Sequence, residues 1–351
     1  MSKKLIAVTG ATGQQGSSVV DFLLKEPETF AVRAITRDPT SPAAQALVAR
    51  GVEVVKADLS SLEETTAAFT DAWGVFGLTQ FYVHGFEGEQ LHGKNIVDAA
   101  VKAGVKHLVW STVEGREGEC AAISWRSKAL IEDRVIASGI PHTFVYIPMY
   151  YENFWTDFFA PSYDEEKGFN WTVGFLPDVP IFAFSVTDLG GLVVPAFREP
   201  EKYTAFDSTP FCAPSNMRAI GPARAVAYAS LHAGAKIKTV VEWLTLRDIA
   251  SQFSEVTGEK ASLAVELTPE AFEASRHADH PAAELMYLSW EFVKRAGPES
   301  GYRQQTLSIY PQAKTYRQWL KDSPIVKERV QRLKAEAEAK KKEHKQEVKA
   351  A

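Results

Sequence analysis

The amino-acid sequence predicts an α/β protein: a doubly wound parallel sheet, a smaller interwoven α+β part and a C-terminal helical tail. Three observations support this fold class. Apolar runs typical of buried strands alternate with amphipathic helical segments as far as Pro148. A glycine-rich turn links the first apolar run to the first helix. An aromatic-rich region without this alternation then follows.

The first elements are a strand, a turn, a helix and a second strand. The strand expected over residues 4–9 leads into the turn, and the helix expected over residues 17–24 has Val19, Val20 and Leu23 on its buried side. A second strand is expected over residues 30–36. This order is that of the Rossmann-type unit, which binds dinucleotides. The turn residues expected to contact the cofactor are Gly10, Ala11, Thr12, Gly13, Gln14, Gln15 and Gly16.

The glycines of the turn are spaced G-x-x-G-x-x-G. Because Gly10 and Gly13 lack a Cβ atom, the backbone can turn sharply there and approach a pyrophosphate closely. At Gly16 the missing side chain lets the helix and the strand pack tightly. Free amides at the helix start favour an anionic ligand. We therefore expect a nucleotide site, with an ordinary turn as the alternative.

The end of the second strand indicates which dinucleotide is bound. An acidic residue there favours NAD by accepting a hydrogen bond from the ribose 2′-hydroxyl, whereas Arg37 can pair with a 2′-phosphate. Arg33 lies earlier on the same strand. Asp38 follows directly and could reach the 2′-hydroxyl instead, and a plain surface role for Arg37 is a further alternative. The sequence favours NADP(H).

Strands and helices continue to alternate up to Pro148. Further strands are expected over residues 52–57, 75–79, 107–111 and 143–147, and helices over residues 62–70, 89–103 and 124–138. Six strands with interleaved helices predict a parallel sheet covered on both faces. This domain is expected to span residues 1–149, with residues 185–198 returning to it.

The remaining chain is expected to form the smaller part, residues 150–322, and a charged helical tail, residues 323–351. The aromatic cluster that begins at Tyr150 leaves two interpretations open: a wall for a flat or apolar substrate, or the core of the smaller part. Between Lys327 and Lys349 the tail has nine lysine or arginine residues and five glutamates, a net charge of +4. This composition, without glycine or proline, favours a solvated helix.

Composition excludes several functional classes. An apolar content of 45% supports a full core, and a net charge of −5 gives no general reason to expect nucleic-acid binding. Cys120 and Cys212 have no metal-ligand spacing and are expected as reduced thiols of a cytoplasmic or nuclear protein. We expect no metal site, no targeting signal and no membrane span.

The candidate site residues follow the carboxyl ends of the strands, where a doubly wound sheet binds its ligand. Asp58 and Leu59 are expected at the adenine edge, with capping of a helix as the alternative role of Asp58. Thr79, Gln80 and Phe81 are expected to line the ribose and nicotinamide side. The sequence therefore predicts that the ligand lies along this edge of the sheet.

Lys128 is the candidate for proton chemistry. It lies near the start of the helix that follows the fifth strand, where an ammonium can hydrogen-bond a nicotinamide ribose and offset a developing alkoxide. An ordinary exposed lysine is the alternative. Short-chain reductases have a tyrosine four residues before this lysine, a position that is Ser124 here. Tyr150 or Tyr151 could supply the missing hydrogen-bond donor.

Several segments together resemble the NmrA-like family, a group of atypical short-chain dehydrogenase/reductases. The glycine turn is shared by many families, but its combination with Thr36-Arg37-Asp38-Pro39 and Tyr150-Tyr151-Glu152-Asn153 is more specific. The likeness runs from the start of the chain to about Gly190, and more weakly to Leu320. The matching segments are Val8–Gly16, Val32–Pro39, Gly93–Lys94, Ser127–Lys128, Tyr150–Asn153 and Ser185–Gly190.

The resemblance implies NADP(H) binding by the turn, Arg37 and Lys128, with residues Tyr150, Tyr151, Glu152 and Asn153 close to the nicotinamide. It also implies two kinds of member. Some are reductases that use a lysine in place of a Tyr–Lys pair. Others are redox sensors that bind regulatory proteins, and a lysine of some sensor-like members is replaced here by Leu91.

The sequence thus predicts an NADPH-dependent reductase of a small aromatic or conjugated carbonyl-type substrate, with Lys128 and Tyr150 as catalytic residues. The alternative is a non-catalytic sensor of the NADPH/NADP⁺ balance that regulates a protein partner. Either protein is expected in the cytoplasm, with the nucleus as the alternative, and without direct contact to nucleic acid or membrane. A homodimer is one assembly open to it, and the sequence does not decide the oligomeric state.

Overall fold

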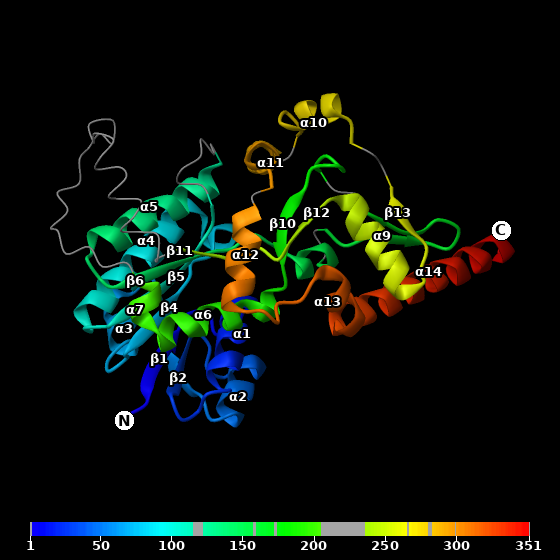
Figure 1. The fold of residues 1–351 in the computed structure, drawn as a ribbon. Helices are drawn as coiled ribbons and strands as arrows, with labels where there is room; N and C mark the ends of the chain where they lie inside the picture. The colour runs from blue at the N-terminus through cyan, green and yellow to red at the C-terminus, as the bar shows by residue number, and fades with distance from the viewer. Residues whose placement is uncertain are drawn as a thin grey trace. The chain divides into compact units, whose positions relative to one another are not determined.

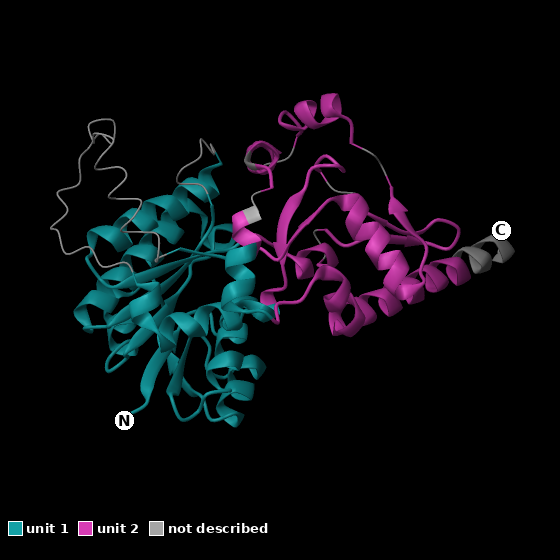
Figure 2. Cartoon of the chain, viewed as in Figure 1, with its two compact units in different colours: residues 1–147, 187–239, 304–311 teal, residues 148–186, 240–303, 312–351 magenta. Residues whose placement is uncertain are grey.

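The computed structural model describes residues 2–114, 122–156, 159–171, 174–204, 236–264, 267–279, 283–298 and 300–350. The chain forms two compact units, which are coloured separately in Figure 2. Unit 1 comprises Met1–Ile147, Thr187–Thr239 and Gln304–Pro311, and unit 2 comprises Pro148–Val186, Val240–Arg303 and Gln312–Ala351. Cys120 and Cys212 lie outside the described residues.

Unit 1 is built on a seven-stranded sheet in the order β11-β6-β5-β4-β1-β2-β3. All neighbouring strands in it run parallel. The chain winds outward from β1 in both directions, which confirms the doubly wound fold. The strands are β1 (Lys4–Val8), β2 (Phe30–Thr36), β3 (Glu53–Lys56), β4 (Gly74–Gly77), β5 (His107–Thr112), β6 (His142–Tyr146) and β11 (Lys236–Lys238).

The seventh strand, β11, corrects the prediction of six strands. It is three residues long, too short to carry a recognisable pattern, and it pairs with β6. The Gln305 side chain accepts a hydrogen bond from Lys238 N (2.9 Å) and donates one to Lys236 O (2.9 Å). The side chain of Gln305, which is distant in sequence, therefore supplies hydrogen-bond partners for two backbone groups of β11. Both segments were assigned to the smaller part by the sequence, and the structure has them in unit 1.

Helices cover both faces of this sheet (Figure 1). On one face α3, α4 and α5 pack together over a core that includes Ile96, Trp110 and Ile131. On the other face α1 packs against α6. The helices are α1 (Gln14–Leu23), α2 (Pro42–Ala49), α3 (Leu62–Ala68), α4 (Phe81–Lys102), α5 (Ile123–Ala137), α6 (Leu189–Arg198), α7 (Pro200–Tyr203) and, ending in this unit, α12 (Ser300–Ile309).

The helix α6 is joined to α1 through Ser18. The Ser18 hydroxyl donates a hydrogen bond to Thr187 O (2.9 Å) and accepts one from Gly190 N (3.0 Å). A Cβ atom at Gly190 would lie 2.3 Å from Ser18 O, so the two helices approach backbone to backbone. This contact holds residues 187–190, where the chain returns from unit 2 to unit 1.

Unit 2 contains two three-stranded sheets with a core rich in aromatic residues. The sheets have the orders β12-β10-β7 and β13-β9-β8. The Trp155 ring packs against Trp171 (5.5 Å between centroids) and Phe253 (5.0 Å), and all three are buried. For these residues the structure supports the core interpretation of the aromatic cluster.

The elements of unit 2 are short apart from three helices. Its strands are β7 (Met149–Tyr150), β8 (Ser162–Asp164), β9 (Gly168–Trp171), β10 (Ile181–Phe184), β12 (Glu242–Leu244) and β13 (Ala261–Leu263). Its helices are η1 (Tyr151–Trp155), α9 (Leu246–Thr257), α10 (Pro269–Ser275), α11 (Ala283–Ala296), α13 (Tyr316–Asp322) and α14 (Pro324–Ala350), and η2 (Val186–Asp188) leads back to unit 1. Within the described part of the chain, no helix combines the length and the apolar character needed to cross a membrane.

Candidate dinucleotide-binding site

The glycine turn joins β1 to α1. Gly10 has a φ of +59°, a backbone conformation that favours glycine, and Gly13 N donates a hydrogen bond to Gly10 O (2.9 Å). A Cβ atom at Gly16 would lie 2.2 Å from the same oxygen, so the helix rests directly on the turn. Gly13 begins α1 without a side-chain cap, which leaves the first-turn amides to be satisfied by a ligand or solvent.

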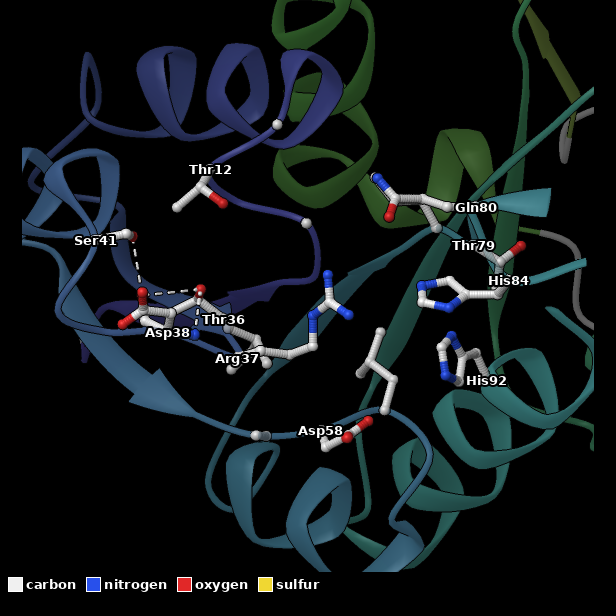
Figure 3. A pocket seen from close by; sticks show the side chains of 16 residues that line it. Thr12, Thr36, Arg37, Asp38, Ser41, Asp58, Thr79, Gln80, His84 and His92 are labelled. Atoms are coloured by element: carbon white, nitrogen blue, oxygen red, sulfur yellow. Dashed lines mark hydrogen bonds between the residues drawn. The ribbon is translucent and has the colours of Figure 1, made fainter. Parts of the chain in front are cut away.

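A pocket with a volume of about 340 Å³ opens beside this turn (Figure 3). This volume lies within the usual range of small-molecule sites. Eight residues that the sequence singled out line it: Gly10, Thr12, Gly13, Arg37, Asp58, Leu59, Thr79 and Gln80. Eight further residues complete the lining: Ile35, Thr36, Asp38, Ser41, Ala57, Leu78, His84 and His92.

The other residues of the predicted turn have different surroundings. Ala11 is fully buried beneath the turn. The Gln15 side-chain oxygen accepts a hydrogen bond from Ser111 Oγ (2.6 Å), which joins the start of α1 to the end of β5. Gln14 is exposed in the first turn of α1, and Phe81 is the first residue of α4. Ser111 thus lies at the carboxyl edge of the sheet, beside the start of α1.

Arg37 and Asp38 differ in what their side chains do. Asp38 Oδ1 accepts hydrogen bonds from Thr40 N (2.9 Å) and Thr40 Oγ1 (2.6 Å), and these bonds lower the pKa of the carboxyl. Arg37 is exposed and extends into the pocket, as Figure 3 shows. Arg33 instead donates to Glu53 (2.9 Å) and to Ala68 O, away from the pocket. Of these two arginines, Arg37 is therefore the one that lines the pocket.

The Asp58 side chain stabilises a tight turn and does not cap a helix. Its Oδ1 accepts hydrogen bonds from Ser60 N (2.9 Å) and Ser60 Oγ (2.8 Å), and these lower the pKa of Asp58. The residue that caps α3 is Ser61, whose hydroxyl accepts a hydrogen bond from Glu64 N. The capping interpretation of Asp58 was therefore wrong, and Asp58 lines the pocket.

His84 and His92 form a pair that the sequence did not predict as part of the site. Their rings meet edge to face with centroids 4.4 Å apart, and both line the pocket. Burial lowers the pKa of His92, and His84 lowers it further. The sequence predicted α4 from residue 89, whereas the helix begins at Phe81 and is interrupted at Gly85, where φ is +64°. This earlier start is what brings His84 to the pocket.

Lys128 is held in a buried polar cluster. Its Nζ donates to Glu89 Oε1 (2.9 Å) and to Thr79 O (3.2 Å), and Thr79 Oγ1 donates to the same carboxylate oxygen (2.8 Å). Glu89 is fully buried and the Lys128 side chain is 17% exposed, so the exposed-lysine interpretation was wrong. Sequence reasoning did not find Glu89, because a single carboxylate within a helix pattern resembles a solvated residue.

Tyr150, Tyr151, Glu152 and Asn153 belong to unit 2, where several of their polar groups are bonded. Tyr151 Oη donates to Glu242 Oε2 (3.1 Å), and Asn153 Nδ2 lies 3.0 Å from the sulfur of Met149. Glu152 is buried and accepts hydrogen bonds from Ser185 Oγ (2.7 Å) and Val186 N (3.1 Å). Burial raises the pKa of Glu152. Tyr150 packs edge to face on Phe184 in the same sheet.

Groups of three or more side chains able to hold a metal ion do not occur among the described residues. A parallel sheet with a glycine turn after its first strand and a pocket beside it that an arginine enters is the architecture of a dinucleotide-binding α/β protein. The sequence model of the NmrA-like family matches residues 2–211. The chain belongs to this family.

Similar proteins are known by sequence and by structure. The NmrA-like family domain-containing oxidoreductase FrzB of Cladobotryum sp is 38% identical over an alignment of 232 residues, and the alignment covers 57% of this chain and 66% of FrzB. The crystal structure of Nmra, a negative transcriptional regulator, aligns with a TM-score of 0.68 at 19% identity over 92% of this chain and 96% of its own. The NADPH-dependent quinone oxidoreductase QOR2 of Escherichia coli aligns with a TM-score of 0.64 at 19% identity, covering 90% and 98%. The structural matches establish the fold.

Proposed function

We propose that the protein is an NADPH-dependent reductase of a small aromatic or conjugated carbonyl-type substrate. The observation that carries the proposal is Arg37, which extends into the pocket beside the glycine turn while the Asp38 carboxylate is held by Thr40. An arginine in this place pairs with a 2′-phosphate and so favours NADP(H) over NAD(H). The proposal agrees with the oxidoreductase names of similar sequences and with NADPH in the similar structure of QOR2.

The residues present fit this cofactor. The close approach at Gly16 holds α1 against the turn, and the uncapped start of the helix leaves its first-turn amides to donate to a pyrophosphate. Arg37 would hold the 2′-phosphate, Asp58 and Leu59 the adenine edge, and Thr79 and Gln80 the ribose side. When bound, NADPH supplies a hydride.

Lys128 would orient the ligand and support the proton transfer. Its Nζ contacts Glu89 Oε1, Thr79 O and, at 3.4 Å, Thr79 Oγ1, and these contacts fix the direction of the ammonium group. A fixed donor costs no reorganisation when charge develops on a substrate oxygen. Tyr150 of unit 2 stays a prediction as an additional hydrogen-bond donor. A cytoplasmic location also remains a proposal.

A redox sensor is the second candidate, and one observation favours it. Ser124 stands four residues before Lys128, where a short-chain reductase has its tyrosine, so the usual proton donor is missing from α5. A sensor would bind NADPH and NADP⁺ with different affinities and change its assembly or its protein partner accordingly, because a ligand shifts an equilibrium only through differential binding.

The first experiment is a titration of the purified protein with NADPH, NADP⁺, NADH and NAD⁺, followed by turnover assays on quinones, enones and aromatic aldehydes. The proposal expects tight binding of NADP(H) and oxidation of NADPH by at least one substrate class. Binding without turnover, together with a change in assembly between NADPH and NADP⁺, favours the sensor. If neither NADP(H) nor NAD(H) binds, both candidates are wrong.

A further inference from the structure

Two histidines of α4 meet at the pocket although they lie two helical turns apart in the sequence. Eight positions of a straight helix span about 12 Å, but the ring centroids of His84 and His92 are 4.4 Å apart. Gly85 interrupts the helix with φ +64° and ψ −172°, a backbone conformation that is nearly restricted to glycine. A Cβ atom at Gly88 would lie 2.8 Å from His84 Cβ, so the missing side chain leaves room for His84. The two glycines therefore allow the contact between the histidines.

Both rings border the pocket that also contains the glycine turn and Arg37. His92 is 9% exposed and His84 is half-buried, and both line the pocket. Figure 3 shows Arg37 and the two histidines reaching this pocket from separate elements, the end of β2 and α4. An anionic ligand in the pocket therefore has two imidazoles near it in addition to a guanidinium group.

The surroundings of His92 favour its neutral form while the pocket holds no anion. Burial lowers the pKa of His92, and the neighbouring His84 and Arg37 lower it further. The carboxylates of Asp58 and Glu89 raise the pKa of His92, but they act against the larger effect of burial. A proton on this ring is therefore held weakly until further negative charge comes close.

The charged groups on the adjoining elements are engaged with one another. Lys128 of α5 forms an ion pair with Glu89, at 2.9 Å. Glu64 of α3 accepts a hydrogen bond from Asp58 N (2.9 Å), and the Asp58 carboxylate accepts hydrogen bonds from Ser60. An imidazole is the side chain whose charge changes most readily near neutral pH. A proton taken up by the histidine pair can therefore balance part of the charge of an entering anion.

We propose that His84 and His92 belong to the cofactor site and that the anionic dinucleotide binds with uptake of up to one proton by this pair. The inference rests on the dinucleotide binding that the proposed function requires. The pyrophosphate and the 2′-phosphate bring negative charge into the pocket, which favours the charged form of a nearby imidazole. The proton passes from solvent to an imidazole nitrogen, and no bond of the cofactor changes. Because the complex holds more protons than the free protein, the affinity for NADPH increases as the pH falls from about 8 to about 6.

Calorimetry counts this proton directly. NADPH is titrated into the full chain in buffers of different ionisation enthalpy, and the dependence of the heat on that enthalpy gives the number of protons taken up. The double variant His84→Asn/His92→Asn should take up about 0.5–1 proton fewer than the unaltered protein. His277→Asn, which alters an exposed histidine of unit 2, is the matched control and should match the unaltered protein. A phosphate monoester titrates near pH 6, but the free ligand is the same for every variant, so the difference reports the histidines.

The pH dependence of the Kd gives the same quantity without heats. One proton corresponds to about tenfold in Kd per pH unit, and half a proton to about threefold. The Kd of the double variant divided by that of the unaltered protein should therefore rise about threefold or more from about pH 7.5 to about pH 6.5. A loss of contacts that does not involve a proton would raise this ratio equally at both pH values.

A further readout follows the two rings in the unaltered protein. In ¹H–¹⁵N NMR of the imidazole nitrogens, the resonances that disappear in His84→Asn and in His92→Asn identify the pair. When NADPH is added to the unaltered protein, the titration of at least one of these rings should move to higher pH. The titration of His277 should stay where it is.

The outcomes separate this proposal from the reductase function. If NADPH binds but the double variant takes up as many protons as the unaltered protein, or if neither ring's titration moves, the proton-linked role of the pair is overturned and the reductase function stands. If NADPH binds with the expected uptake but no substrate class is reduced, the reductase function fails and the role of the pair stands. If no dinucleotide binds, both are wrong.

Discussion

Arg37 offers a direct test of which dinucleotide this fold binds. The guanidinium is exposed and extends from the end of β2 into the pocket. Hydrogen bonds to a charged partner contribute about 1.5–3 kcal/mol. Because solvent and salt screen part of this in an open pocket, we expect Arg37→Ala to lose about 2 kcal/mol of binding free energy for NADPH. At 1.4 kcal/mol per factor of ten, its Kd should rise about 30-fold.

The comparison with NADH makes the test specific. NADH has no 2′-phosphate, so its Kd should change by less than about twofold in the same variant. Nicotinamide fluorescence at about 0.15 M salt measures both constants. Asp38→Asn is the matched control, since the carboxylate is already bonded to Thr40 and should not affect the preference. Equal losses for NADPH and NADH, or an unchanged NADPH affinity, would refute the assignment of the 2′-phosphate to Arg37.

Three further predictions concern stability, measured by urea unfolding. A Cβ atom at Gly16 would lie 2.2 Å from the carbonyl oxygen of Gly10, whereas a Cβ atom at Gly13 would lie 3.3 Å from the same oxygen. The free energy of unfolding should therefore fall by about 1–3 kcal/mol in Gly16→Ala and by clearly less in Gly13→Ala. Equal losses in the two variants would contradict this packing. Lys128→Ala leaves the buried Glu89 carboxylate without its cation and should lose about 3 kcal/mol. Adding Glu89→Gln should recover most of that loss, and no recovery would argue against the ion pair as its cause. Burial lowers the pKa of His107 from 6.5 to about 3, so protonation favours the unfolded chain and stability falls as the pH drops from 6.5 toward 3. From pH 7.5 to 5 the loss should be about 2 kcal/mol, and His107→Asn should remove this part of the pH dependence.

The core of unit 1 could be predicted because its signals are local. The apolar runs of β1 and β2 flank a helix whose start is marked by three glycines, and each glycine has a local reason in the structure. Gly10 adopts a positive φ, and Gly16 leaves room for the turn above it. Such features are encoded within a few residues, so the sequence alone indicates strand, turn and helix.

The missed features depend on distant contacts or on interrupted patterns. β11 is too short to recognise, and the Gln305 side chain that satisfies its edge is far away in the sequence. The first turn of α4 was missed because Gly85 interrupts the helical periodicity at that point. His84 lies on this turn, so a residue that lines the pocket was missed for this reason.

The charges of the site differ between the end of β2 and the α4–α5 cluster. Lys128 forms an ion pair with buried Glu89, so the two groups add no net charge to their surroundings. Arg37 extends into the pocket from the end of β2 and is exposed there, so its positive charge is available to an anionic ligand. In the proposed reductase, attraction of the anionic cofactor would therefore come from Arg37, whereas Lys128 would act as an oriented hydrogen-bond donor whose charge is already balanced.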